Sequence, residues 1–399
     1  MLATETIRSV NELTGWWARS AVPEAAEGTV FSAAGVWPLL ALLAGGADGR
    51  ARGELHGTLS LAGADSASAR GRELIEALGA MEGVAVATGL WTRAERVPLR
   101  PVWAAALPPG VHGELTGAPD RDRAALDAWA TRHTDGRITG LPVPLTADTL
   151  LVLAGALLLR TRWTRPFGEG WLEPDDGPWR GRRLTGLYRS GPDLDLLRVA
   201  PDTPAGPLTL AEVAGDNGLE VRLVRGAAGV PGGEVLQTAV AVLDGEHPAL
   251  PGSALPYGEP APGVRVVEAT SWEERPTLNL ATVRFTVRAE HDLLDRAGLF
   301  GLRTATDTGR GHFPGISPTP LAVTSARQSM TAGFTATGFE AAAVTSVGMG
   351  LGGVPRQRSK QVAARFDQPF GFLARHRASG LILAAGWVTG PDEAPNRPW

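Results

Sequence analysis

The chain has 399 residues, 43% of them hydrophobic, so it can bury one large core or divide into several domains. Its formal net charge of -4 provides no overall positive field, which argues against nucleic acid or an anionic membrane as partner. The absence of cysteine excludes disulfides, thiolate metal ligands and thiol nucleophiles.

The N-terminal segment MLATETIRSVNELTGWWARS, residues 1–20, lacks the basic region and continuous apolar stretch of a signal peptide. Its apolar residues recur on one helical face, which predicts an amphipathic helix packed on the core. The longest apolar run, residues 150–159, is too short to cross a bilayer. We therefore expect a soluble, cytoplasmic protein with no membrane partner.

Helical patterns dominate the first third of the chain and strand patterns dominate the rest. Apolar spacing predicts helices over residues 1–20, 36–46, 51–61, 71–81 and 123–133. Strands are predicted over residues 148–163, 218–226 and 277–290, a helix over 291–302, and a closing hairpin from 363–376 and 380–390. No repeat or long linker divides the chain, so we expect one α+β domain over residues 1–399.

The stretch TGFEAAAVTSVGMGLGGVPRQRS, residues 337–359, contains a G-x-G-x-x-G at Gly348, Gly350 and Gly353. A dinucleotide site needs a strand before this motif and a helix after it. Here VPRQRSKQV follows, with Pro355 and no helical periodicity. A glycine-rich loop is the better interpretation.

Other motifs of catalysis or ligation are absent from the sequence. There is no G-x-S-x-G, H-E-x-x-H or P-loop pattern, and the seven histidines lie far apart along the chain. Asp175 and Asp176 lie among turn formers, and the basic run RGRR at 180–183 is typical of a solvated edge. We predict no metal, no cofactor and no catalytic residue, although folding could still bring two histidines together.

Several segments, taken in order, resemble the serpin family. VFSAAGVWPLLALLAGGADGRARGELHGTL resembles the first strand-to-helix region, and LDAWATRHTDGRITGL is similar to a later helix of the family. TLLVLAGALLLRTRWTRPF resembles the central strand that ends in W-x-x-P-F, and FDQPFGFLARHRASGLILAAGWVTGP resembles the closing hairpin. VRFTVRAEHDLLDRAGLFGL and HFPGIS fit the region before the reactive loop, so the resemblance spans nearly the whole chain.

The resemblance implies an α+β fold of three β-sheets with eight or nine helices, and the chain is similar to a bacterial-type member. It also implies an exposed reactive-centre loop over about residues 337–364, so the glycine-rich stretch would belong to this loop. In serpin inhibitors a protease cuts the loop, which then inserts as a new strand into the main sheet. The resemblance places Trp163 at the breach, the end of that sheet where insertion begins.

The reactive-loop hinge maps onto residues 338–343 by this resemblance. Gly338 matches the hinge glycine, and Glu340, Ala341, Ala342 and Ala343 match the small-residue run that follows. EAAA alone could also be a fragment of helix. Phe339 stands where the family usually has Thr or Ser, so a bulky ring would have to enter the sheet first.

The scissile bond cannot be fixed from the sequence because two counts disagree. Counting from the hinge puts it near Gly352 and Gly353, whereas counting back from FDQPF puts it near Arg358 and Ser359. Glycines at 348, 350, 352 and 353 would lose more entropy on insertion than branched residues, which weakens the drive to insert.

The shutter, a polar group under the main sheet in the family, is also altered. The resemblance places Ser32 there, with Gly35, Gly155 and Gln328 in place of the usual polar residues. Such a change would remove polar partners that hold the strands before insertion.

Two functions follow from the resemblance. The first is inhibition of a serine protease of trypsin-like or subtilisin-like specificity, with Arg356 or Arg358 as bait. The second is a non-inhibitory serpin scaffold that binds a small molecule or a partner, or that acts as an enzyme.

Overall fold

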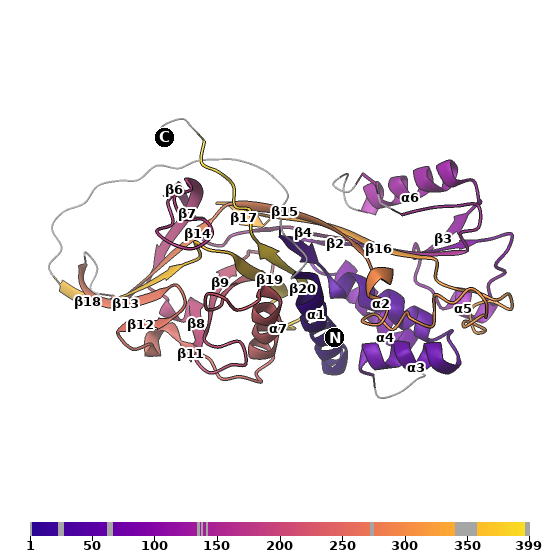
Figure 1. Ribbon diagram of the computed structural model, residues 1–399, viewed down its shortest axis with the longest axis horizontal. Helices are drawn as coiled ribbons and strands as arrows, with labels where there is room; N and C mark the ends of the chain where they lie inside the picture. Colours follow the sequence, from indigo (N-terminus) through magenta and orange to yellow (C-terminus); the bar gives the residue numbers. More distant parts are fainter. Residues whose placement is uncertain are drawn as a thin grey trace.

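The computed structural model describes residues 2–22, 28–61, 67–133, 136, 139–140, 143–271, 275–339 and 357–395. This part of the chain forms three β-sheets and seven α-helices, arranged along one elongated body (Figure 1). The α+β class and the three sheets agree with the prediction. None of the described helices has the length and apolar content needed to cross a membrane.

The central sheet has the strand order β3-β2-β4-β16-β17-β5, with β15 paired to β16. Its strands are β2 (Val84–Arg93), β3 (His112–Leu115), β4 (Leu151–Leu159), β5 (Thr161–Arg162), β15 (Phe285–Asp292), β16 (Ser325–Phe334) and β17 (Gly338–Phe339). Strand β4 is almost entirely apolar because both of its faces are covered. Helix α6 (Pro119–His133) lies on one face and α2 (Ala33–Ala44) on the other (Figure 1).

The core sheet has the order β1-β20-β19-β10-β9-β8-β11. Its strands are β1 (Thr29–Phe31), β8 (Leu197–Ala200), β9 (Leu208–Ala214), β10 (Leu219–Arg225), β11 (Leu250–Pro251), β19 (Phe370–His376) and β20 (Ile382–Val388). The predicted closing hairpin is β19 and β20, whose turn is closed by a hydrogen bond from His376 N to Leu381 O. Helices α1 (Thr4–Ala21) and α7 (Gly232–Leu243) pack together beside this sheet.

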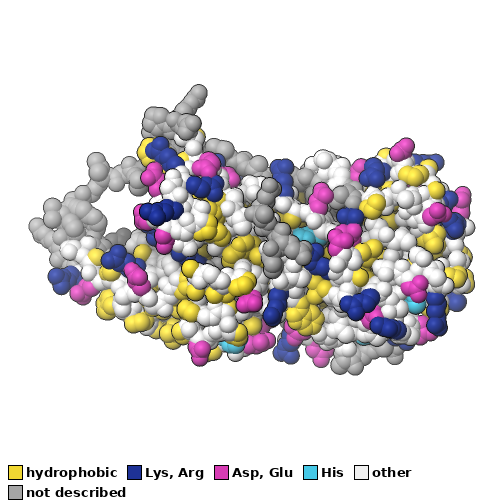
Figure 2. All heavy atoms as spheres, in the orientation of Figure 1, with side chains coloured by type: hydrophobic (Ala, Val, Ile, Leu, Met, Phe, Trp, Pro, Cys, Tyr) yellow, Lys and Arg dark blue, Asp and Glu magenta, His cyan; other side chains and the backbone are white. Residues whose placement is uncertain are grey.

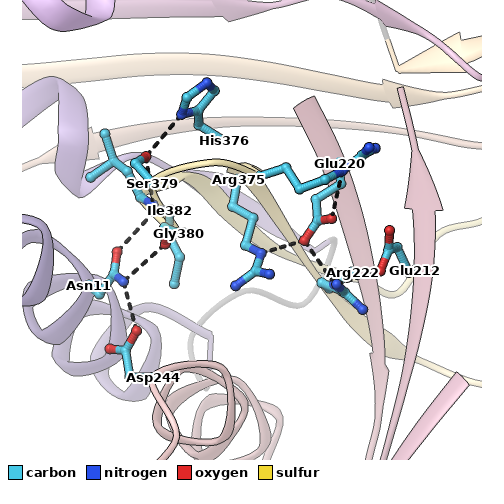
Figure 3. Close-up of polar contacts among 12 residues, drawn as sticks. Asn11, Glu212, Glu220, Arg222, Asp244, Arg375, His376, Ser379, Gly380 and Ile382 are labelled. Carbon is cyan, nitrogen blue, oxygen red and sulfur yellow. Dashed lines mark hydrogen bonds and ion pairs between the residues drawn. The ribbon is translucent and has the colours of Figure 1, made fainter. Parts of the chain in front are cut away.

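A buried polar group fastens α1 to the core sheet and to α7 (Figure 3). Asn11 Nδ2 donates to Asp244 Oδ1 at 2.9 Å and to Gly380 O at 3.2 Å, and Asn11 Oδ1 accepts from Ile382 N. Asn11 thus pairs all its polar atoms although only 1% of it is exposed, as a buried amide requires.

The distal sheet has the order β12-β13-β18-β14-β7-β6 and forms the opposite end of the molecule from α3 (Gly49–Leu59), α4 (Ala67–Gly79) and α5 (Pro101–Ala105) (Figure 1). Its strands are β6 (Gly168–Leu172), β7 (Leu184–Gly191), β12 (Gly258–Ala261), β13 (Val264–Ser271), β14 (Thr277–Val283) and β18 (Gln357–Arg365).

The predicted helix over residues 291–302 is wrong. His291 and Asp292 complete β15, and only Leu294–Arg296 forms a short 3₁₀ helix. Gly301 adopts a φ of +66°, in the left-handed region, and a Cβ there would lie 2.6 Å from Glu54 O. The chain therefore turns at Gly301 to pack closely on α3, and a continuous helix cannot form.

Candidate functional site: the hinge and the central sheet

The central sheet is paired differently in its two halves. In one half β4 and β16 are parallel neighbours, in register from Val152 with Ser325 to Ala156 with Ser329. In the other half β17 lies between β16 and β5, with Phe339 opposite Phe334 on one side and opposite Thr161 on the other. At one end of the sheet β4 and β16 are direct neighbours, whereas at the other end the two residues of β17 lie between β16 and β5.

A tight turn over residues 335–338 directs the chain from β16 back into the sheet. Thr335 N donates to Gly338 O at 2.9 Å, and Gly338 N donates to Thr335 Oγ1 at 3.2 Å. Trp163 holds the outer side of this turn, because its backbone N donates to Thr337 O and its indole Nε1 donates to Thr335 O, both at 2.9 Å. The residue predicted at the breach therefore contacts the turn directly.

Gly338 and Phe339 are buried in this part of the sheet. A Cβ on Gly338 would lie 2.4 Å from Thr161 O, a backbone atom of a paired strand, so only glycine fits without displacement. Phe339 is 3% exposed, and its ring centroid lies 5.7 Å from that of Phe372 and 6.5 Å from that of Trp163. The Phe339 ring therefore already lies in an aromatic cluster beneath the sheet, and its effect on insertion stays a prediction.

The predicted shutter residues do come together beneath the sheet. Gln328 is fully buried; its Oε1 accepts from Ser32 N at 2.8 Å and its Nε2 donates to Ser32 O at 2.9 Å. Ser32 Oγ donates to Leu383 O at 2.6 Å and accepts from Gly35 N, so it caps α2 and contacts the core sheet. A Cβ on Gly155 would lie 3.3 Å from Gly35 O, so α2 crosses β4 closely at this point.

This geometry corrects the expectation that the shutter has lost its polar partners. One amide side chain, that of Gln328, satisfies both backbone polar groups of Ser32 and links β16 to the start of α2. One donor and one acceptor side by side on the same amide make a bidentate contact, whereas the two ring nitrogens of an imidazole point in different directions.

His291 is a buried titratable residue of this region that the sequence analysis did not single out. It lies on β15 directly opposite Gln328, and its Nε2 is 3.0 Å from Val30 O. Burial lowers the pKa of His291 below its usual value of 6.5. The alternation of the segment TVRAEH, with His291 on the buried face, was the available signal.

Only some of the remaining hinge residues and candidate scissile residues lie in the described part of the chain. Glu340, Ala341, Ala342, Ala343, Gly352, Gly353 and Arg356 lie outside the described residues. Arg358 and Ser359 lie in β18, paired with Thr270 and Ala269 of β13. The ends of the predicted loop over 337–364 are therefore strands, and the segment between them spans residues 340–356. The backbone at Arg358 and Ser359 is engaged in the ladder with β13, and the choice of the cut bond stays a prediction.

No group of three or more His, Asp or Glu side chains that could hold a metal occurs within the described ranges. Asp176 contacts Gln368 at an exposed position, and among the described residues no partner is found for Asp175. The described candidate site consists of the hinge turn, β17 and the buried polar group beneath the central sheet.

The three sheets, the hinge turn and the buried group beneath the central sheet are the features that the resemblance to serpins led us to expect. The family model for "Serpin (serine protease inhibitor)" matches residues 17–176 and 265–391. The chain belongs to the serpin family.

Relatives and solved structures agree with this assignment. The chain is 24% identical to "Putative serpin-Z6C" of Oryza sativa subsp. japonica over 92% of each protein. It is 31% identical to "Putative serpin-Z8" from the same plant, over 35% of this chain and only 36% of that relative. The resemblance to a bacterial-type member stays a prediction.

Two solved structures share the fold. Serpin48 of the insect Tenebrio molitor has a TM-score of 0.73 at 19% identity, covering 98% of this chain and 100% of that one. Human thyroxine-binding globulin, complexed with thyroxine, has a TM-score of 0.72 at 15% identity, with coverage of 98% and 100%.

Proposed function

We propose that this protein inhibits serine proteases of trypsin-like specificity by loop cleavage, acyl-enzyme formation and insertion of the cut loop into the central sheet. The observation that carries the proposal is the position of β17, which already lies between β16 and β5. In this mechanism the serine of the protease attacks the loop, and the acyl bond remains because insertion carries the protease away before water completes hydrolysis. The protease supplies the chemistry and the sheet supplies the driving force.

The register of β17 supports insertion over a defined length. Gly338 pairs with Arg162 and Phe339 with Thr161, so a continuing strand would place Thr345 opposite Gly155. The pairing of Phe339 with Phe334 extends to place the same residue opposite Gln328. Gly155 and Gln328 pair with each other in the present structure, so both registers place the inserted strand between β4 and β16. The inserted strand would pair with the whole of β4 once it reaches Met349, opposite Leu151.

The alternation of side chains also favours insertion. Because the Phe339 side chain faces the buried side, a continuing strand would place Ala341, Ala343, Thr345, Val347 and Met349 inward. Glu340, Gly348 and Gly350 would fall on the opposite face, which is the face that α6 covers over β2 and β4. Gly348 and Gly350 have no side chain, so they would fit beneath α6 on this covered face.

This register also narrows the position of the cut bond. A strand that fills β4 uses the chain to Met349, and β18 begins at Gln357, so the bond belongs between these two residues. Arg356 is the basic residue in that segment. We therefore infer that the target protease accepts arginine before the cut bond. A trypsin-like protease is the first candidate and a subtilisin-like protease is the second.

The proposal is tested by mixing the protein with trypsin or subtilisin and separating the products by denaturing electrophoresis. We expect a covalent adduct of protein and protease, and cleaved protein with a much higher thermal midpoint than the intact chain. Cleavage with neither an adduct nor a higher midpoint would favour a non-inhibitory scaffold instead.

A matched pair of variants isolates the insertion step. Ala341→Arg places a charge on the inward face, where burial without a partner is costly, so we expect cleavage without adduct. Glu340→Gln changes the neighbouring outward position and should retain the adduct. Equal adduct yields from the two variants would contradict the inferred register.

A further inference from the structure

A pocket of about 530 Å³ lies at the end of the molecule opposite the distal sheet, far from the hinge. It is lined by residues from the C-terminal end of α2, the first turns of α3 and α4, and α5, together with Arg100 and Gly315. Figure 1 shows these helices clustered at this end of the molecule. The volume is within the range of small-molecule sites in proteins. Three arginines line it, namely Arg52, Arg72 and Arg100, together with Val102 and Trp103, and no acidic residue does.

Each of the three arginines is oriented by a backbone carbonyl. The contacts are Arg52 Nε to Ala47 O at 2.7 Å, Arg72 Nη1 to Ala106 O at 3.3 Å, and Arg100 Nε to Pro314 O. A carbonyl fixes the guanidinium without neutralising its charge, and it occupies one of five N–H donors. The remaining donors stay available to a ligand, in the planar geometry that matches carboxylate, sulfate or phosphate oxygens.

Neighbouring arginines on the same elements behave differently. Each of them pairs with a carboxylate: Arg50 of α3 with Glu54 at 3.0 Å, Arg70 of α4 with Glu5 at 3.0 Å, and Arg96, which precedes α5, with Asp148 at 3.3 Å. Arg52, Arg72 and Arg100 have no carboxylate within 4.0 Å in the part of the chain that the structure describes. On α3, on α4 and directly before α5, the arginines without a carboxylate partner are therefore those that line the pocket.

The other polar side chains of the pocket have partners elsewhere. Ser68 Oγ donates to Ala41 O at 3.4 Å and Trp103 Nε1 donates to Leu42 O at 3.4 Å, both on α2. The wall beside the arginines is apolar: Val102 is 86% exposed, more than any other exposed large hydrophobic residue described. A bound molecule would thus meet both guanidinium donors and apolar side chains.

We propose that this pocket binds a small organic anion, in which a carboxylate, sulfate or phosphate group contacts the three arginines and an apolar body covers Val102 and Trp103. A long polyanion fits less well, because basic and acidic side chains alternate over the visible surface at this end of the molecule (Figure 2). The site does not depend on loop insertion, so the proposal stands or falls separately from protease inhibition.

Isothermal titration calorimetry with 2-naphthalenesulfonate tests the proposal. We expect saturable binding at one site, weakened by added sodium chloride as salt screens the arginine charges. 2-Naphthalenemethanol has the same ring without the charge and should not bind measurably, and inorganic sulfate should compete weakly. No saturable binding of the sulfonate, or equal binding of the alcohol, would overturn the proposal.

Two variants and one control assign the binding to this pocket. Arg72→Gln should weaken sulfonate binding at least about tenfold, which corresponds to ~1.4 kcal/mol. Val102→Glu places a carboxylate at a highly exposed position, where folding should be unaffected, and should abolish binding. Arg70→Gln removes a neighbouring arginine already paired with Glu5 and should leave affinity within about twofold. Equal losses in Arg70→Gln and Arg72→Gln, or strong binding of heparin without binding of the sulfonate, would indicate a general polyanion surface and contradict the assignment.

Discussion

The core sheet and the central sheet differ in how completely their middle strands are paired. In the core sheet, β10 pairs with β19 from Leu219 to Val224 and with β9 from Glu220 to Arg225. In the central sheet, β4 extends to Leu159 but pairs with β16 only from Val152 to Ala156. One sheet is complete and the other has a vacant strand position that β17 has begun to fill. The proposed insertion would therefore change the central sheet and leave the core sheet as it is.

Buried polar groups reinforce this difference. In the core sheet, Glu220 has a fully buried side chain that meets Arg222 at 3.0 Å and also contacts Arg375 and Arg377 (Figure 3). Burial alone would raise the pKa of Glu220, but the charges of Arg222 and Arg375 outweigh it and the pKa lies below its usual value. Beneath the central sheet, the buried polar contact is neutral, between the amide of Gln328 and the backbone of Ser32. The central sheet also has an ion pair, Arg327 with Asp292 at 2.7 Å, but both of those side chains are partly exposed, whereas the side chain of Glu220 is fully buried.

The largest effect is expected from Glu220→Ala in the core sheet. The variant removes the buried carboxylate that Arg222 and Arg375 share, and among the described residues only Arg222 keeps another partner, Glu212 at 2.5 Å. Breaking a buried ion pair in this way typically costs about 3–5 kcal/mol of unfolding free energy. Urea unfolding monitored by tryptophan fluorescence measures the change. Arg377→Gln removes a partner whose side chain is 45% exposed and should cost far less, so similar losses in both would show that the cluster is not a buried charge network.

A smaller effect is expected from Gln328→Ala at the shutter. Ser32 N and Ser32 O lose their partners in a buried position, which costs about 2–3 kcal/mol. Ser329→Ala, one residue along β16 and without a side-chain hydrogen bond in the described structure, is the control. If the contact of Gln328 with Ser32 stabilises the sheet before insertion, Gln328→Ala lowers the thermal midpoint of the intact protein more than that of the loop-cleaved protein. Equal shifts would mean that this contact stabilises the fold in both states alike.

A local effect is expected from Phe339→Ala at the hinge. Removal of the ring from the aromatic cluster weakens the attachment of β17, which can detach while the rest of the fold remains. Hydrogen exchange at the amides of Gly338 and Phe339 should accelerate strongly, with little change in global stability. Thr337→Ala, an exposed turn residue, should leave this exchange nearly unchanged. Unchanged exchange in Phe339→Ala would mean that the turn, rather than the ring, holds the hinge.

Much of the fold could be predicted from local pattern. The continuous apolar run of β4 predicts a strand buried on both faces, and the period of α1 predicts its packed face. Helix α7 was missed because GGEVLQTAVAVL begins with two glycines and is apolar on most sides. The helix over 291–302 was predicted in error because Gly301 is required by packing on α3, which local periodicity does not report.

The site was predictable in position but not in geometry. The resemblance located Gly338 and Phe339, yet the aromatic cluster that receives Phe339 is drawn from strands distant in sequence. The bidentate contact of Gln328 with Ser32 joins residues 296 positions apart, and no local pattern encodes it. From the sequence, Gln328 looked like the loss of a polar partner, whereas in the fold its amide supplies both hydrogen bonds to Ser32.

The smallest effect is expected from the titration of His291, which lies under the central sheet. Its pKa in the folded protein is lowered by burial, so the unfolded chain binds more protons once the pH falls below about 6.5. The stability that depends on neutral His291 is therefore fully present above pH 6.5 and declines as the pH falls further. His291→Gln should lower the difference in thermal midpoint between neutral and mildly acidic solution. If wild type and variant lose the same stability on acidification, other groups, and not the histidine beside Gln328, set the acid sensitivity of this sheet.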